Sequence, residues 1–309
     1  MGLESVVLEA LAHCLRPEGF LPEQANLFGA YPVNSRQHDN GSSREKLTCS
    51  MLRVEQEARD MSLLLPKELI LNLQETIRKR YSRPHPVRQL LLSGRLTKEQ
   101  LQGWAKNQFH EFRNIHRFFG IRYQKCPIPQ LRRDLLENMV EEEGEDLFGG
   151  KYPSHAELWV RFAEGTGMAR EEILSYEPLP GIRAALEMYV QLVQQSHWTV
   201  AIGTGLVFEG EGPKRMRAER EALEKYYSWI PSTALDFFRA HEYHDEGHGN
   251  MVIDVIQKYC MEEQLQEEMR AAVKTRTDIM WLQNESIYQT YVRPALSVEV
   301  VKEVEGRLE

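Results

Sequence analysis

Apolar residues recur at helical spacing through most of the chain from residue 51 onward. They return every three or four positions, and the strict alternation typical of a half-buried strand does not occur. Short polar or Gly- and Pro-containing stretches separate the periodic runs, as expected where helices end. The pattern predicts an all-α protein, with helices over residues 51–64, 67–80, 97–123, 128–145, 154–165, 169–174, 181–208, 213–228, 231–259, 262–271 and 276–291.

The first 60 residues have a different pattern. Residues 29–50 are polar and rich in Gly, Pro, Asn and Ser, which predicts a long loop. We therefore expect an N-terminal extension over residues 1–60 and one helical domain over residues 61–309. The sequence has no repeat of fixed period and no low-complexity tract, so a solenoid is not expected.

Composition and charge narrow the classes of function. The net charge is −8 and the pI is near 5.8, which argues against a nucleic-acid partner because phosphate binding requires a concentrated basic surface. The sequence has no run of about 18 apolar residues and no signal-peptide pattern, so we expect a soluble, cytoplasmic protein that binds no membrane. The four cysteines form no CxxC pair, so oxygen and nitrogen atoms would hold any metal.

The segment from His241 to His248 carries the clearest chemical signal. His241, Asp245 and His248 stand at positions i, i+4 and i+7. At about 100° per residue, their side chains fall within about 60° of one another on a helix. One helical face could therefore hold one metal ion. The alternative is that both histidines are ordinary core or surface residues, so the interpretation depends on ligands from other helices.

Two glutamates are candidate ligands on other predicted helices. Glu142 lies on an apolar helix face, where an ionised carboxylate is costly unless it is paired or bound to a metal. Glu209 ends a helix on the same face as Trp198 and Ile202, directly before Gly210. The alternative for each is a solvated carboxylate at a helix end, which the helix dipole disfavours for Glu209.

His155 adds a third histidine, at the start of a predicted helix that follows a glycine-containing loop. Carboxylates and imidazoles without thiolates suit iron or manganese, and bridging carboxylates suit a pair of ions. Helical bundles build dinuclear sites in this way, from side chains on facing helices. The sequence thus predicts a metal centre formed by Glu142, His155, Glu209, His241, Asp245 and His248.

From about residue 66 to residue 291, the chain resembles the heme-oxygenase-like diiron oxidases and oxygenases, relatives of the pyrroloquinoline quinone synthase and thiaminase II folds. The segments that carry the resemblance are 96–108, 137–144, 155–163, 209–213 and 241–248. The resemblance implies a seven-helix heme-oxygenase-like bundle without heme, in which the six residues surround two iron ions, Fe(II) or Fe(III). It also implies O2 as a co-substrate and an external electron donor.

Two features depart from the pattern of this family. The interval from Glu142 to His155 is longer than usual, so the loop over residues 146–154 must fold outward, which its two glycines allow. Family members that oxygenate nitrogen carry an additional carboxylate on the helix where this chain has His116. His116 is therefore either an additional ligand or substrate contact, or a core histidine beside neighbouring phenylalanines.

The resemblance implies an oxygenase or oxidase that acts on a small nitrogen-containing metabolite, with N-oxygenation in a biosynthetic pathway as the expected reaction. Desaturation, C–C cleavage or oxidative decarboxylation of an amino or carboxylic acid are the alternatives. We expect His197, Thr199 and Tyr243 to line a polar substrate pocket. A homodimer and a reductase partner are both compatible with the sequence.

Three further interpretations use the same fold. A cofactor-free oxidase, like the quinone synthase relatives, would need no set of six ligands. A thiaminase-type hydrolase would need a nucleophilic cysteine, and neither Cys126 nor Cys260 lies in a recognisable motif. A non-catalytic binding protein is the third interpretation.

Overall fold

The computed structural model describes residues 63–81, 85–209 and 212–306, except for the side chains of Glu209 and of residues 243–249. The predicted N-terminal extension, its polar loop and nearly all of the helix expected over residues 51–64 lie outside this part. Residues 63–65, which are described, are not helical.

The prediction of an all-α fold is confirmed over the described residues, which contain helices and no strand. Three 3-10 segments and one π-helical turn accompany the α-helices: η2 (Glu145–Phe148), η3 (Ser232–Leu235), η5 (Arg293–Ala295) and the π-helix η4 (Tyr288–Val292). The α-helices are α3 (Pro66–Tyr81), α4 (Pro86–Leu92), α5 (Lys98–Phe112), α6 (Ile115–Lys125), α7 (Pro129–Gly144), α8 (His155–Gly165), α9 (Arg170–Ser175), α10 (Pro180–Gln195), α11 (Trp198–Gly203), α12 (Leu206–Glu209), α13 (Gly212–Tyr226), α14 (Asp236–Tyr259), α15 (Glu263–Ile287) and α16 (Val298–Glu305).

Local sequence signals explain where several helices begin. Thr97 and Gln100 form a capping box at α5, in which each side chain accepts a hydrogen bond from the other residue's backbone N–H. Ser154 caps α8 by accepting from the backbone N–H of Glu157. Proline occupies the first turn of α4, α7 and α10, where its missing N–H costs no helical hydrogen bond.

The single helix predicted over residues 97–123 is wrong, because the chain turns between α5 and α6. The Asn114 side chain donates a 2.8 Å hydrogen bond to the backbone carbonyl of His110. Such local bonds compete with the helical ladder, and the helix ends at Phe112. The turn changes the helical phase, so residues of α6 do not continue the faces of α5.

Other predicted boundaries also differ. The run over residues 181–208 forms three helices, because Ser196 bonds back to the carbonyl of Leu192 and His197 caps α11. The two runs over residues 262–271 and 276–291 belong to one continuous helix, α15, and the π-helix that follows it. The short helices α4 and α16 were not predicted, since each spans only about two turns, which is shorter than the window of about 11 residues over which helical periodicity is read.

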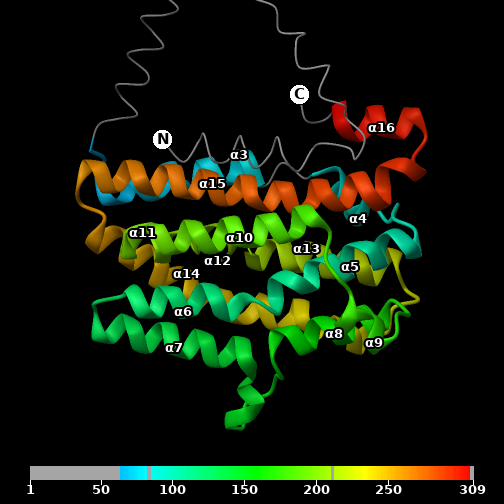
Figure 1. Ribbon diagram of the computed structural model, residues 1–309, viewed down its shortest axis with the longest axis horizontal. Helices are drawn as coiled ribbons and strands as arrows, with labels where there is room; N and C mark the ends of the chain where they lie inside the picture. The colour runs from blue at the N-terminus through cyan, green and yellow to red at the C-terminus, as the bar shows by residue number, and fades with distance from the viewer. Residues whose placement is uncertain (1–62, 82–84, 210–211, 307–309) are drawn as a thin grey trace, which may run out of the picture. The chain divides into compact units, whose positions relative to one another are not determined.

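The helices pack in layers around two apolar clusters. In Figure 1, α3 and α15 lie together on one side and α6 and α7 on the other, and α10 packs against both α15 and α6. One cluster contains Trp159 and Phe237, and the other contains Leu135 and Val255. Phe208 on α12 packs against both clusters, so it marks where they meet. No helix in the described ranges is long and apolar enough to span a membrane.

Replacing Gly103 with alanine is expected to destabilise the protein, because α5 packs closely against Tyr291. An added Cβ would lie 2.5 Å from Cγ of Tyr291, so the ring or the helix must shift. Overpacking of this kind lowers the free energy of unfolding by about 1–3 kcal/mol. Urea denaturation of the purified variant would measure the loss.

Gly120→Ala is the matched control, since Gly120 lies within α6 and no described atom is within 4 Å of its added Cβ. Alanine should raise the free energy of unfolding there by roughly 0.5–1 kcal/mol, because it is the better helix former. If both variants were stabilised, the close packing of α5 on Tyr291 would be refuted.

Candidate metal centre

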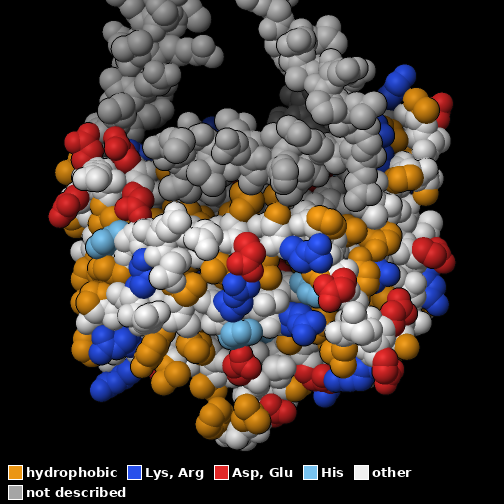
Figure 2. All heavy atoms as spheres, viewed as in Figure 1, with side chains coloured by type: hydrophobic (Ala, Val, Ile, Leu, Met, Phe, Trp, Pro, Cys, Tyr) orange, Lys and Arg blue, Asp and Glu red, His pale blue; other side chains and the backbone are white. Residues whose placement is uncertain are grey.

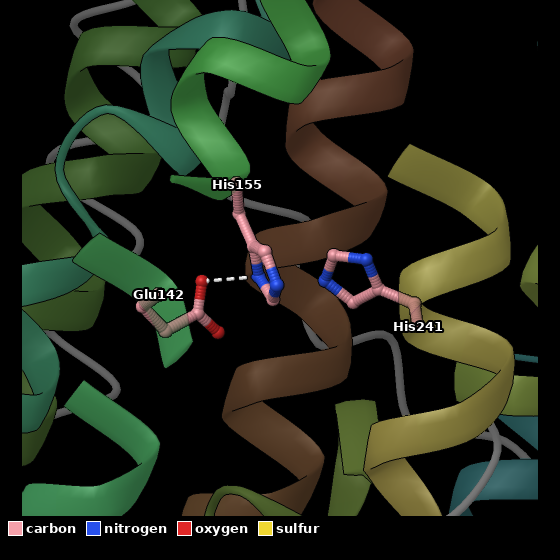
Figure 3. A group of neighbouring side chains, drawn as sticks. All are labelled: Glu142, His155 and His241. Carbon is pink, nitrogen blue, oxygen red and sulfur yellow. Dashed lines mark ion pairs between the residues drawn. The ribbon is translucent and has the colours of Figure 1, made fainter. Parts of the chain in front are cut away.

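Three of the six predicted ligands converge between the helices. One ligand atom from each of Glu142, His155 and His241 lies within 4.8 Å of those of the other two. Figure 3 shows them reaching one point from α7, α8 and α14. All three are largely shielded from solvent, and the His241 side chain is only 1% exposed. A carboxylate and two imidazoles in such a place must be paired or bound to a metal.

A backbone bridge brings Glu142 and His155 together. Gly144 and Pro153 form an isolated antiparallel bridge, and Asp146 N–H donates to the Tyr152 carbonyl at 3.0 Å. The bridge thereby holds the end of α7, which carries Glu142, beside the start of α8, which carries His155. Their side chains meet with Nδ1 of His155 at 2.6 Å from Oε2 of Glu142.

The loop between these two residues folds outward, as the sequence required. Gly144 and Gly149 adopt φ values of +123° and +87°, which side-chain-bearing residues rarely take. The segment leaves the lower edge of the bundle in Figure 1 and carries η2 at its tip. Leu147 and Phe148 are more than two-thirds exposed there, where apolar atoms gather in Figure 2. The insertion therefore leaves the position of His155 intact.

A hydrogen bond fixes which nitrogen of His241 faces the cluster. Nδ1 of His241 lies 2.9 Å from the backbone carbonyl of Phe237, one turn earlier on α14. A carbonyl only accepts, so Nδ1 carries the hydrogen and the lone pair of the neutral ring is on Nε2. Histidine ligands in metal sites are commonly oriented by a bond of this kind.

Aromatic rings enclose the two histidines. The His155 and His241 ring centroids are 4.2 Å apart, and the Phe237 ring is 4.2 Å from that of His241. Phe208 and Phe112 lie 5.9 Å and 6.5 Å from His241. These rings keep water away, so electrostatic interactions inside the cluster are stronger than at the surface.

The donor set fits a hard or borderline metal ion, because it combines one carboxylate oxygen with two imidazole nitrogens and lacks thiolate. Glu209 lies at the end of α12, and Asp245 and His248 lie in α14, one and two turns beyond His241. The side chains of these three residues are outside the described part, so their place in the predicted set of six remains a prediction.

His116 does not join this cluster, and the interpretation as a core histidine is wrong. Its side chain is 52% exposed and lies 4.0 Å from the carboxylate of Glu143. The turn at Asn114 explains this position, since it rotates His116 away from the face that carries Phe109 and Phe112. A single helix through this segment was the wrong assumption.

A carboxylate that the sequence analysis missed lies on α5. Glu111 is 8% exposed and pairs with Arg276 of α15, which is 4% exposed. The signal was available, because Glu111 follows Trp104 and Gln108 by seven and three residues, on one helical face. Glu111 lies on α5, one helix before the position on α6 where His116 stands.

A cavity lies beside Glu142, between α5, α6 and α15. Its empty volume is about 540 Å³, including its opening to solvent. Glu111, Arg122 and Arg276 supply charged groups in its wall, and the remaining lining is mainly aromatic. Arg122 donates to the Tyr189 hydroxyl at 2.6 Å and to the Ala201 carbonyl at 3.0 Å. The cavity therefore offers apolar and charged contacts next to a candidate ligand.

The predicted pocket residues His197 and Thr199 lie at the start of α11. His197 is exposed, caps α11, and its Nδ1 lies 2.8 Å from the Thr199 hydroxyl. Thr199 is fully buried at that cap. Neither residue lines the cavity beside Glu142, because local capping uses their polar atoms. The side chain of Tyr243 lies outside the described residues.

The chain is similar in sequence to curated proteins and in structure to solved ones. It is 28% identical to the pyrroloquinoline-quinone synthase of Cronobacter sakazakii over 211 residues, which are 67% of this chain and 81% of that protein. A domain of unknown function with a heme oxygenase-like fold from Shewanella denitrificans superposes with a TM-score of 0.62 and 14% identity, covering 77% of this chain and 98% of that one.

A TenA homologue from Pseudomonas syringae pv. tomato superposes with a TM-score of 0.59 and 17% identity, covering 72% of this chain and 92% of that one. The predicted heme-oxygenase-like fold is therefore confirmed. A family profile described as TENA/THI-4/PQQC matches residues 71–292, which is well over half of the chain. The chain belongs to the TENA/THI-4/PQQC family.

Proposed function

We propose that this chain is an O2-activating non-heme diiron oxygenase or oxidase that acts on a small nitrogen-containing metabolite. The observation that supports this function is the buried convergence of Glu142, His155 and His241, with Nε2 of His241 oriented as a ligand. Glu209, Asp245 and His248 complete the proposed set. When bound, the two iron ions would supply the reduction of O2.

The protein's own residues contribute charge, orientation and exclusion of water. The carboxylate of Glu142 neutralises positive charge at the centre, and the Phe237 carbonyl holds the ring of His241 in place. Phe112, Phe208 and Phe237 shield the site from solvent. The cavity beside Glu142 would hold the part of the substrate that reacts.

N-oxygenation in a biosynthetic pathway is the reaction we favour. The resemblance associates N-oxygenation with an additional carboxylate. The buried carboxylate of Glu111, in the wall of the cavity that Glu142 also lines, supports this reaction. Desaturation, C–C cleavage and oxidative decarboxylation would use the same centre. Each of these reactions requires an external electron donor, so a reductase partner is part of the proposal.

A cofactor-free oxidation is the second candidate function. The 28% identity to a pyrroloquinoline-quinone synthase favours a cofactor-free oxidation, because the resemblance associates those synthases with an oxidation that needs no set of metal ligands. The two candidates differ in what Glu142, His155 and His241 do: they bind metal in the first, and they contact substrate or exchange protons in the second.

Anaerobic loading with ferrous iron tests the proposal directly. We expect about two irons per chain in the wild type, as in other bundles with dinuclear carboxylate–histidine sites. On mixing with O2, a transient visible absorbance should appear in stopped flow. His241→Ala and Glu209→Ala should each lose iron and abolish the transient.

His116→Gln is the matched control, because it removes an exposed histidine that lies away from the cluster. It should retain iron and the transient at wild-type levels. Absence of stoichiometric iron from the wild type, together with oxygen-dependent turnover of a quinone precursor, would replace the diiron proposal with the cofactor-free one.

The interpretation as a thiaminase-type hydrolase predicts a reactive cysteine thiol. Burial raises the pKa of the Cys260 thiol to about 12, and burial also raises the pKa of Cys126. A raised pKa keeps a thiol protonated and unreactive, so at pH 8 the thiolate fraction of Cys260 should be about 10³-fold below that of an ordinary cysteine.

Iodoacetamide labelling followed by peptide mass spectrometry measures this difference. Cys260 in the native protein should react far more slowly than in urea, and Cys260→Ala should leave iron binding and oxygen consumption unchanged. Rapid native alkylation that abolishes activity would instead identify a nucleophilic thiol.

A further inference from the structure

Two buried tryptophans lie next to the candidate metal centre. Trp159 follows His155 by four residues on α8, so both side chains lie on one face of that helix. Trp104 of α5 meets Trp159 edge to face, with 5.3 Å between ring centroids. Trp104 and Trp159 are only 2% and 1% exposed. The tryptophan pair therefore extends from a candidate ligand through the interior of the bundle.

A hydrogen-bonded pair of tyrosines packs against α5 beside Trp104. The hydroxyl oxygens of Tyr176 and Tyr291 are 2.8 Å apart. The Tyr291 ring lies so close to Gly103 that an added Cβ would be 2.5 Å from Cγ of the ring. Asn107 donates to the Gly103 carbonyl at 2.9 Å and to the Tyr176 hydroxyl at 3.2 Å. Both tyrosines are partly exposed, so the backbone at Gly103 connects the buried tryptophans to rings that reach solvent.

The position of Tyr291 depends on a break in helical geometry. Tyr291 lies in the π-helix η4, which directly follows α15. Such turns are rare and occur frequently at functional sites. Gly103, which has no side chain, leaves the room that the ring needs on α5. An ordinary aromatic core requires neither a π-helical turn nor a glycine inside a helix, so both features point to a role for this tyrosine.

The chemistry of these side chains suggests that role. Tryptophan and tyrosine give up a single electron more readily than phenylalanine, histidine or aliphatic side chains. A metal centre that reacts with O2 carries out one-electron chemistry, and the protein around it must prevent side reactions. When no substrate is bound, an oxidised centre would otherwise attack its own ligands. A series of oxidisable rings that ends at the surface gives it a different source of electrons.

We infer that Trp159, Trp104 and the tyrosine pair carry single electrons to the oxidised metal centre when no substrate is bound. We call Trp159, Trp104, Tyr291 and Tyr176 the Trp–Tyr path. The inference rests on the proposed function, because the oxidised centre is the electron acceptor. It adds a route that protects the centre and that substrate turnover itself does not need.

Each passage along the Trp–Tyr path moves one electron and releases one proton. Trp159 gives an electron to the centre and regains one from Trp104, which regains one from the tyrosine pair. Burial and the hydrogen bond to Tyr291 raise the pKa of Tyr176, so this phenol is protonated at neutral pH. An oxidised phenol loses its proton to water, which leaves a neutral tyrosyl radical. The external electron donor of the proposed function then returns the electron, and water returns the proton.

Freeze-quench electron paramagnetic resonance tests the Trp–Tyr path. Iron-loaded wild type mixed with O2, without substrate or reductant, should give a tyrosyl radical whose hyperfine splitting changes when ring-deuterated tyrosine is incorporated. Trp104→Phe should bind iron and react with O2 as the wild type does, yet lose most of the tyrosyl signal, because phenylalanine does not relay the electron. Trp229→Phe is the matched control, since Trp229 is 45% exposed and its ring contacts are Tyr227 and Lys98. It should keep the full signal.

A variant with both Tyr176→Phe and Tyr291→Phe identifies the surface end of the path. It keeps both rings and removes only the hydroxyls, so it should fold and bind iron. The tyrosyl signal should disappear, and the oxidising equivalent should remain on the tryptophans. Peptide mass spectrometry should then find oxygen added to Trp104 or Trp159, which the wild type keeps intact.

An unchanged tyrosyl signal in folded, iron-loaded Trp104→Phe would overturn the inference. An unchanged signal in the double variant would overturn it as well, since the radical would then lie on another tyrosine; this variant decides alone if Trp104→Phe does not fold. O2 consumption by the wild type without any tyrosyl radical would refute the Trp–Tyr path and leave the proposed function standing. Absence of any reaction with O2 would refute the proposed function, and the path with it.

Discussion

The packing of ionisable side chains into an apolar interior is the constraint on which this structure depends. Glu142, His155 and His241 lie near the place where two hydrophobic clusters meet, marked by Phe208. Burying these groups would destabilise the fold unless they satisfied one another or a bound ion. The bridge at Gly144, the cap of α8 and the hydrogen bond at His241 all serve that convergence, because each fixes a side chain on a different helix.

Periodicity predicted most helices, whereas single side chains decided their ends. The α5–α6 turn follows from one hydrogen bond by Asn114, and the α10–α11 break follows from Ser196 and His197. Asparagine, serine and histidine also occur inside helices, so the sequence alone could not place these turns. Because the α5–α6 turn was not predicted, the helical phase of α5 was extended through residue 116. His116 was therefore placed on the face of Phe109 and Phe112, which it does not share.

The candidate site was partly predictable for the same reason. Glu142 was identified from its place on the apolar face of a continuous helix, and that geometry depends only on local spacing. His155 needed the outward loop, which the glycines suggested but the Gly144–Pro153 bridge defines. The spacing of residues placed Glu111 on the face of Trp104 and Gln108, but Arg276, which pairs with it, lies 165 residues away. Local spacing can mark such a carboxylate as buried, whereas it cannot identify a long-range partner.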